Sequence, residues 1–445
     1  MSKLFLKLAE SGHNITIIDT TAKKGLPDYG FNNIHMVDMR CGKDYFKKFE
    51  IYEMVWEKMD EPLTFSGIFE IGDMFLNDVL KEKSYLLPAI LETDFDVIIL
   101  DDLASVHGMF ISELLYKKKK TPTIQYGTTF QLEILRSSRA YGSSFLNEPT
   151  DAGPLPREIV EVFHPGKFTS RTLNAQLEGK FSFQNHFSKS AIVLSEAFWG
   201  LGLPISQGND LYSVGGYCPE FGALDKEMEE FLNDPKSKGT IILAFGSYVK
   251  WYLAPQHILD AYFGAFENLT DYRIVFSYDG EPREVPKHVK LSPWAPQKDI
   301  LNHPKTKIFI SHSGIKSTNE ALCAGIPLIL MPCFADQKYN SEFFSHLGYS
   351  EFMNKYYLTK EIVLQNIHKV LDNFEEKKRR ILKVRSMYID RVMNPMDLAE
   401  FYVIRTAKKK EDVIFKRKGI FLSWNEYLNI DFFVSLIGLI WLISK

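Results

Sequence analysis

Short apolar segments rich in Val and Ile alternate with longer stretches of helical periodicity along most of the chain. The apolar segments predict strands at Ile15–Asp19, Val97–Asp101, Thr123–Tyr126, Ala191–Ser195, Thr240–Phe245, Arg273–Ser277, Lys307–Ser311 and Pro327–Met331. Most of them are continuously apolar, which is typical of strands covered on both faces. Their alternation with helices predicts parallel sheets in a doubly wound α/β fold.

The length of the chain and one change in composition divide it in two. A chain of 445 residues is too long for one ordinary core and long enough for two. The Gly- and Pro-rich segment Gly200–Asp225 separates the halves. We therefore expect two Rossmann-like domains, residues 1–222 and 223–420, that face each other across a cleft at the carboxyl ends of their strands. From about Glu361 the chain becomes helical and charged, as expected for helices that cover the second domain and return to the first.

The first ten residues, MSKLFLKLAE, predict an amphipathic helix that ends near Gly12. They lack the long apolar core and small-residue cleavage site of a signal peptide, so we expect no signal peptide in this chain. Folds with right-handed crossovers normally begin with a strand. The helix at the start therefore predicts a first domain truncated at its N-terminus, without its first strand.

The C-terminal residues 421–445 contain the uncharged run Phe432–Ile443, preceded by Trp424 and Tyr427. The run is shorter than the ~20 residues that a membrane-spanning helix needs. Three interpretations stay open: a span cut short, an interfacial anchor and a core helix. We prefer the first, a partial membrane anchor, because aromatic residues before the run are typical of a membrane interface.

Composition excludes some classes of function. The net charge of −3 and the absence of a large basic patch give no footprint for nucleic acid. Four cysteines without a Cys-x-x-Cys pair predict no zinc site and no redox motif. Glycosylation sequons begin at Asn14 and Asn268, and they favour a luminal location only weakly.

The stretch from Lys307 to Asn340 carries the candidate chemistry. A predicted strand runs into Ser311-His312-Ser313-Gly314, after which a helix begins. The free N–H groups of a helix N-terminus bind phosphate, and His312 can add a hydrogen bond to a diphosphate. Asp336 and Gln337 follow the next strand, so in a parallel sheet they lie at the same edge and can bind sugar hydroxyls.

Each of these residues also has an ordinary structural interpretation. His312 could be a capped polar residue at a strand end, and Asp336 could be a turn residue. Ser317 and Glu320 fit a capping box, in which Glu320 binds the start of its own helix and no ligand. Only the joint spacing of these residues favours a binding site.

This spacing resembles the donor-binding signature of the UDP-glycosyltransferase family, in particular the animal UDP-glucuronosyltransferases. The matching positions are Trp294-Ala-Pro-Gln297, Ile300-Leu301, His303-Pro304-Lys305, Ser311-His312, Glu320, Gly325-Ile-Pro327, Pro332, Phe334-Ala335-Asp336-Gln337 and Asn340. Weaker similarity extends over nearly the whole chain, from Lys7-Leu-Ala-Glu-Ser-Gly-His13 to the apolar tail. The resemblance implies the two-domain fold called GT-B.

The resemblance also implies a role for each donor-site residue. Trp294 would stack on uracil, Gln297 would bind the nucleoside and Glu320 would bind the ribose hydroxyls. Asp336 and Gln337 would hold the sugar. The diphosphate would meet Ser247, Ser311, His312, Gly314, Lys316 and Ser317. The chain departs from the family at Ser313, where Gly is usual, and at Lys316-Ser317, where Asn-Gly is common. Lys316 could offer its charge to the diphosphate or could crowd the loop.

Members of this family invert the sugar: a His deprotonates the acceptor hydroxyl and an Asp orients that His. Asp101, at the end of a predicted strand, takes the place of the Asp. The place of the His falls at Met1 or before it, and we interpret His13, His35 and His107 as structural. The alternative function is therefore an impaired UDP-sugar-binding homologue or fragment with weak or absent turnover.

Two rival enzyme classes are weaker. Asp94-Phe95-Asp96 has the form of a metal-binding Asp-x-Asp, but it begins a strand instead of following one. A dinucleotide oxidoreductase needs Gly-x-Gly-x-x-Gly after an opening strand, and neither half has it.

The resemblance implies a UDP-sugar as co-substrate, no cofactor and no metal. It implies a small lipophilic acceptor with a hydroxyl, whose pocket could involve Phe145 and the Phe181–Phe187 region, although core packing explains these aromatic residues more simply. It further implies an endoplasmic reticulum membrane protein with luminal catalytic domains and a single C-terminal anchor. The sequence leaves open whether the sugar is glucose or glucuronate and whether the chain forms a homo-oligomer.

Overall fold

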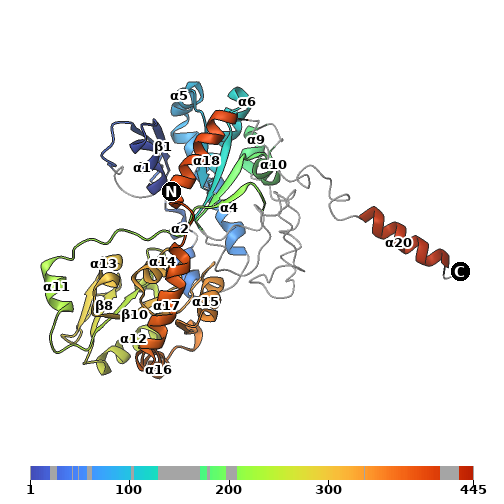
Figure 1. The fold of residues 1–445 in the computed structure, drawn as a ribbon. Helices are drawn as coiled ribbons and strands as arrows, with labels where there is room; N and C mark the ends of the chain where they lie inside the picture. The colour runs from blue at the N-terminus through green and yellow to red at the C-terminus, as the bar shows by residue number, and fades with distance from the viewer. Residues whose placement is uncertain are drawn as a thin grey trace.

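The computed structural model describes residues 2–20, 28–42, 44–48, 50–57, 63–101, 105–128, 171–177, 181–196, 208–334, 336–410 and 430–443. They form two α/β bodies (Figure 1). Phe145, Asp102, Trp424 and Tyr427 lie outside the described residues.

All strand pairs described in the first domain are parallel. One sheet pairs β1 (Ile15–Asp19) with β2 (Ile34–Asp38), and a second has the order β3 (Ile98–Asp101), β4 (Thr123–Gly127), β5 (Ile192–Ser195) and β6 (Leu211–Ser213). The helices of this half are α1 (Ser2–Glu10), α2 (Tyr45–Lys48), α3 (Ile51–Glu57), α4 (Leu63–Glu82), α5 (Leu87–Glu92), α6 (Val106–Lys119), α9 (Arg171–Gln176) and α10 (Phe183–Lys189), with the 3-10 turn η1 (Ser84–Leu86).

The second domain contains a six-stranded parallel sheet in the order β12-β11-β10-β7-β8-β9. Its strands are β7 (Thr240–Ala244), β8 (Arg273–Ser277), β9 (Val289–Ser292), β10 (Thr306–Ser311), β11 (Leu328–Leu330) and β12 (Ser350–Phe352). Its helices are α11 (Lys226–Leu232), α12 (Gln256–Asn268), α13 (Gln297–Asn302), α14 (Ile315–Ala324), α15 (Gln337–His346), α16 (Lys360–Asp372) and α17 (Phe374–Ile389), with the 3-10 turns η3 (Trp251–Leu253) and η4 (Lys355–Tyr357).

The buried strands of the second sheet pack on both faces, as their continuous apolar sequences predict. In β7, Ile241 and Leu243 point into one core cluster while Ile242 and Ala244 point into the other. Successive side chains of a strand point to opposite faces, so an apolar residue is needed at every position. The two-domain doubly wound fold expected from the sequence is therefore confirmed.

The predicted strands differ from the observed ones by a residue or two at most, whereas β2, β6, β9 and β12 are missing from the prediction. All four are edge strands of their sheets. An edge strand has one neighbour and tolerates polar residues, so its sequence need not be continuously apolar, although the edge strands β1 and β3 were predicted correctly. In β2 every residue is at least partly exposed.

The aromatic residues Phe181, Phe183 and Phe187 belong to the first-domain core. Their exposed fractions are 5%, 1% and 0%, and they pack with residues of α4 and α6. The core interpretation of these residues is therefore the correct one.

Helix α18 (Pro395–Lys409), which follows the second domain, packs on the first domain (Figure 1). Its residues Met396, Ala399 and Val403 join the core cluster of α1, β4 and β5. Tyr402 stacks on Tyr212 of β6, with ring centroids 3.5 Å apart.

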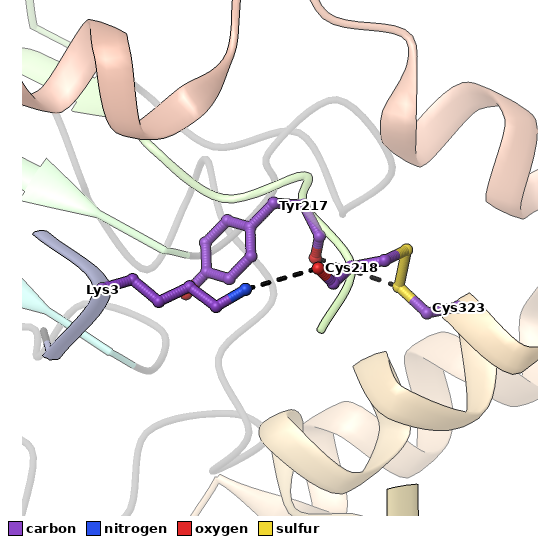
Figure 2. The surroundings of a disulfide bond; sticks show 4 residues. All are labelled: Lys3, Tyr217, Cys218 and Cys323. Carbon is purple, nitrogen blue, oxygen red and sulfur yellow. Dashed lines mark hydrogen bonds between the residues drawn. A yellow bond between two sulfur atoms is a disulfide. The ribbon is translucent and has the colours of Figure 1, made fainter. Parts of the chain in front are cut away.

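A disulfide joins Cys218 and Cys323 across 105 positions of sequence (Figure 2). Cys218 lies in the segment that connects the two domains, and Cys323 lies in the last turn of α14. On the first-domain side, the Lys3 ammonium donates to the Cys218 carbonyl at 3.3 Å and lies 4.4 Å from the centre of the Tyr217 ring. The bridge therefore fixes the connecting segment to the second domain, a pairing that the sequence analysis did not anticipate.

The apolar C-terminal run forms α20 (Ile430–Ile443), which lies apart from both domains (Figure 1). All of its residues are exposed, so the core-helix interpretation is wrong. Within the described ranges, no helix has the length and hydropathy to cross a membrane. The membrane anchor stays a prediction.

We expect the double substitution Cys218→Ser and Cys323→Ser to lower the free energy of unfolding by about 2–4 kcal/mol, because the bridge limits the unfolded chain. Denaturant unfolding with and without dithiothreitol measures the change. Cys41 lies in the first domain and takes no part in this bridge, so Cys41→Ser should unfold like the unchanged protein. Equal stability of the double variant and the parent would contradict a structural bridge.

Candidate functional site

The candidate site lies at the carboxyl edge of the second sheet. Ser311, the last residue of β10, pairs with Ala244 of β7 on one side and Leu330 of β11 on the other. Because all three strands are parallel, their exit loops meet at this edge. The structure thus brings Ser247, His312 and Asp336 to one edge of the sheet, as the sequence predicts.

His312 lies between two glycines. A Cβ atom on Gly246 would lie 3.1 Å from His312 Cε1, and one on Gly314 would lie 2.5 Å from His312 Nε2. Any larger residue at Gly314 would therefore displace the imidazole. His312 Nδ1 is buried and has no hydrogen-bond partner among the described residues. Burial lowers the pKa of His312 to about 4, so the ring is neutral at pH 7.

Ser313 adopts φ +71°, in the left-handed region that favours glycine. A side chain in this conformation costs about 1–2 kcal/mol. Here the chain carries Ser where the family usually has Gly, and the backbone keeps the conformation that suits Gly. Hydrogen bonds support it: Ser313 N–H donates to Ser311 Oγ, and the Asn340 side-chain amide donates to the Ser313 carbonyl.

The N-terminus of α14 is free of a side-chain cap. Gly314 is its N-cap residue and has no side chain to offer. Ser317 lies inside the first turn and Glu320 bonds to another helix, so the capping-box interpretation is wrong. The first N–H groups of α14 are left for water or an anion. Lys316, in the same turn, is exposed.

A second cluster joins α13 to α14. The Gln297 side-chain amide donates to Glu320 Oε2 at 2.7 Å and to Ser317 Oγ at 3.1 Å. Burial raises the pKa of Glu320, and the hydrogen bond from Gln297 opposes that rise. Just before α13, Trp294 is 72% exposed. A tryptophan so exposed offers a ring face on which a planar ligand can stack.

Asp336 and Gln337 differ in their surroundings. Asp336 Oδ2 accepts a hydrogen bond of 2.9 Å from Asn340, and burial raises the pKa of Asp336. Gln337 is 3% exposed, and its Oε1 accepts from the N–H groups of Cys333 and Phe334. The oxygen of Gln337 thus orders the exit loop of β11.

Asn340 is a site residue to which the sequence analysis gave no role. It is fully buried, and its amide joins the Ser313 carbonyl to the Asp336 carboxylate. Asn340 follows Asp336 by four positions, which places the two side chains on one face of a helix. This spacing was the signal in the sequence from which their contact could have been predicted.

Asp101 ends β3, opposite Tyr126 of β4. Burial raises the pKa of Tyr248, and the nearby charge of Asp101 raises it further. Tyr248 directly follows Ser247 in the exit loop of β7, so Asp101 faces the second domain from the first.

Three described histidines of the first half, His13, His35 and His107, are those that the sequence analysis interprets as structural. His107 Nε2 is 2.8 Å from Thr20 Oγ1, and burial lowers the pKa of His107 to about 4. His13 and His35 are exposed. Asp94 pairs with Lys119 at 2.7 Å, at the opposite end of β3 from Asp101. In the part of the chain that the structure describes, no group of three His, Cys, Asp or Glu residues could hold a metal.

Comparison with known proteins agrees with this geometry. The sequence model of the family described as "UDP-glucoronosyl and UDP-glucosyl transferase" matches residues 162–443. A UDP-glycosyltransferase UGT5 from Dactylopius coccus is 29% identical over 98% of this chain and 85% of its own length. A UDP-glucuronosyltransferase 1A7 from Mus musculus is 26% identical over 89% of this chain and 78% of its own.

Two further matches concern half of the chain and the fold. A UDP-glucuronosyltransferase from Pleuronectes platessa is 31% identical over 50% of this chain, which spans about half (48%) of that relative. The crystal structure of CalG4, the calicheamicin glycosyltransferase, superposes with a TM-score of 0.62 at 16% identity, covering 91% of this chain and 94% of that one.

That structure supports the GT-B fold, and the family model matches more than half of the chain. The chain belongs to the family of UDP-glucuronosyl and UDP-glucosyl transferases, which are glycosyltransferases.

Proposed function

We propose that this chain binds a UDP-sugar at the carboxyl edge of the second sheet and transfers its hexosyl or hexuronosyl group to a hydroxyl of a small lipophilic acceptor. The observation that carries the proposal is the neutral His312, held between Gly246 and Gly314 beside the uncapped N-terminus of α14. Such a terminus suits a diphosphate, because its N–H groups and its helix dipole both attract negative charge.

The surrounding groups fit the remaining parts of a UDP-sugar. The exposed face of Trp294 suits uracil, and the Gln297–Glu320 pair offers hydrogen bonds to the nucleoside and ribose. Asn340 joins Asp336 to the Ser313 carbonyl, in the loop before α14. Asp336 therefore lies near the proposed diphosphate site, where it suits a sugar hydroxyl. Ser247, Ser311, Lys316 and Ser317 complete the proposed diphosphate site.

Transfer would proceed by direct displacement with inversion. The acceptor oxygen attacks the anomeric carbon, the bond from that carbon to the diphosphate breaks, and a general base takes the acceptor proton. We assign Asp101 the role of orienting that base and stabilising its positive charge. The N–H groups of α14 would stabilise the leaving diphosphate, so the proposed reaction needs no metal. The description of the family, and the name of the relative from Mus musculus, favour glucuronic acid or glucose as the sugar.

We further propose that the protein resides in the endoplasmic reticulum membrane with its two domains in the lumen. The Cys218–Cys323 bridge suits an oxidising compartment. Asn14 and Asn268, which begin the two sequons, are both exposed. The exposed apolar surface of α20 suits contact with lipid.

We expect Trp294→Ala to weaken UDP and UDP-glucose binding alike by about tenfold or more, because stacking on a base contributes about 1–3 kcal/mol. In contrast, Asp336→Ala should weaken UDP-glucose or UDP-glucuronate binding and spare UDP, since Asp336 faces only the sugar in this proposal. Isothermal titration calorimetry with the three ligands measures both effects.

Tyr85→Ala serves as the control, because Tyr85 is also an exposed aromatic residue but lies in η1 of the first domain. It should bind all three ligands like the unchanged protein. The donor site is refuted if UDP does not bind, or if Trp294→Ala and His312→Ala leave its affinity unchanged.

The neutral state of His312 gives a pH dependence. Its folded pKa of about 4 lies below the ordinary 6.5, so its contribution to stability is complete above pH 6.5 and is lost as the pH falls toward 4. We expect the free energy of unfolding to fall over this window more steeply in the unchanged protein than in His312→Asn, by up to about 1.4 kcal/mol per pH unit. Denaturant unfolding from pH 7.5 to 4.5 measures the slopes. The exposed His13→Asn should retain the steeper slope, and equal slopes for His312→Asn and the parent would show that His312 titrates normally.

A further inference from the structure

Lys355 is a lysine enclosed between the two domains. It begins η4, directly after β12, and its side chain is 1% exposed. Its ammonium donates to the Val55 carbonyl at 2.5 Å and to the Cys333 carbonyl at 2.9 Å. Burial of an ammonium is costly unless hydrogen bonds replace its water. These two bonds are therefore strong, and they join segments that are far apart in sequence.

The two carbonyls belong to different domains. Val55 lies in the last turn of α3, where backbone carbonyls lack partners within the helix and a positive charge is favoured. Cys333 follows β11 and opens the exit loop that leads to Asp336. One side chain thus fastens a helix of the first domain to the loop that is proposed to hold the sugar.

Helix α3 is docked firmly enough to serve as such a support. Val55 and Trp56 are each 3% exposed and belong to the core cluster of the second domain. The Trp56 indole N–H donates to the Lys250 carbonyl at 2.9 Å, and its ring lies 5.3 Å from the ring of Trp251. The first domain therefore contributes two core residues to the second.

From Cys333 the hydrogen bonds continue into the site. The N–H groups of Cys333 and Phe334 donate to Gln337 Oε1 at 2.9 and 3.1 Å. Gln337 begins α15. In the first turns of this helix, Asn340 donates to Asp336 Oδ2 and to the Ser313 carbonyl. The carbonyl held by Lys355 and the carboxylate of Asp336 are thus parts of one ordered loop.

We propose that Lys355 is a positioning residue, which fixes the exit loop of β11 against α3 and so makes recognition of the sugar depend on the docked first domain. The inference rests on the proposed function, in which Asp336 holds the sugar while Trp294 and α14 hold UDP. Lys355 has no part in UDP binding itself. Its loss therefore affects the sugar and spares the nucleotide.

The test is Lys355→Met in the full chain, which keeps the length of the side chain and removes the ammonium. We expect the affinity for UDP to stay within about twofold, while that for UDP-glucose and UDP-glucuronate falls by about tenfold, as loss of a hydrogen bond to a charged group implies. Titration calorimetry with UDP, UDP-glucose and UDP-glucuronate measures the ratio. A variant that loses affinity for UDP and UDP-sugars equally, or for neither, overturns the proposal.

Lys377→Met is the matched control. Lys377 is also a buried lysine of the second domain, but its ammonium pairs with Glu351 at 2.6 Å. It should retain the preference between UDP-sugar and UDP. The same loss of preference in Lys377→Met would show a general effect of removing a buried lysine and would overturn the proposal.

A measurement on the unchanged protein covers the case in which Lys355→Met does not fold. Saturating UDP-glucose should slow hydrogen exchange at the amides of α15 and also of α3 in the first domain, whereas UDP alone should slow it at α13 and α14 and at neither α15 nor α3. Protection of α15 without protection of α3 overturns the proposal that Lys355 couples the two. If Asp336→Ala binds UDP-glucose as well as the parent does, the proposed sugar site itself fails, which separates the two failures.

Discussion

Parallel pairing of β10 with β7 on one side and β11 on the other brings three exit loops to one edge of the second sheet. Everywhere else these strands are closed in by core residues on both faces, so polar groups can face a ligand only where the strands end. The order of the strands, more than any single residue, therefore decides which loops share a site. The helix after β10 adds its N-terminus at the same place, because a crossover helix begins where its strand stops.

Burial gives these loops a consistent electrostatic character. It lowers the pKa of His312 and raises the pKa values of Glu320 and Asp336, so each group is pushed toward its neutral form. A diphosphate brings negative charge, which would be repelled by a fully ionised carboxylate nearby. Backbone N–H groups and a neutral imidazole attract it without a buried cation, while the exposed Lys316 can move toward it at little cost in desolvation.

The sequence predicted every strand that has a neighbour on both sides, together with the edge strands β1 and β3. It missed the edge strands β2, β6, β9 and β12, because an edge position does not require apolar residues throughout. It also predicted which residues gather at the sheet edge, since strand ends and helix starts determine that place. It could not predict their partners. The resemblance assigns Gln337 to the sugar and Glu320 to the ribose. The structure adds that the Gln337 oxygen accepts from two backbone N–H groups and that Glu320 accepts from Gln297. The Cys218–Cys323 bridge and the contact of Lys355 with Val55 depend on how the two domains dock, which local patterns do not encode.

Each domain completes its core with an element from the other half of the chain. The first supplies Val55 and Trp56 of α3 to the second, and the second half of the chain returns α18 to the first. The chain passes between the domains twice, once after β6 and once between α17 and α18, and these two segments lie against each other. Arg391 donates to the Ser213 carbonyl, and a Cβ atom on Gly216 would lie 2.7 Å from the Tyr388 carbonyl oxygen. Domain opening would therefore be a rotation about these crossings, with the disulfide holding one of them to α14. Such a rotation would strain the contacts of α3 with the second domain, where Lys355 holds Val55 and where Trp56 packs on Trp251, so these contacts oppose opening.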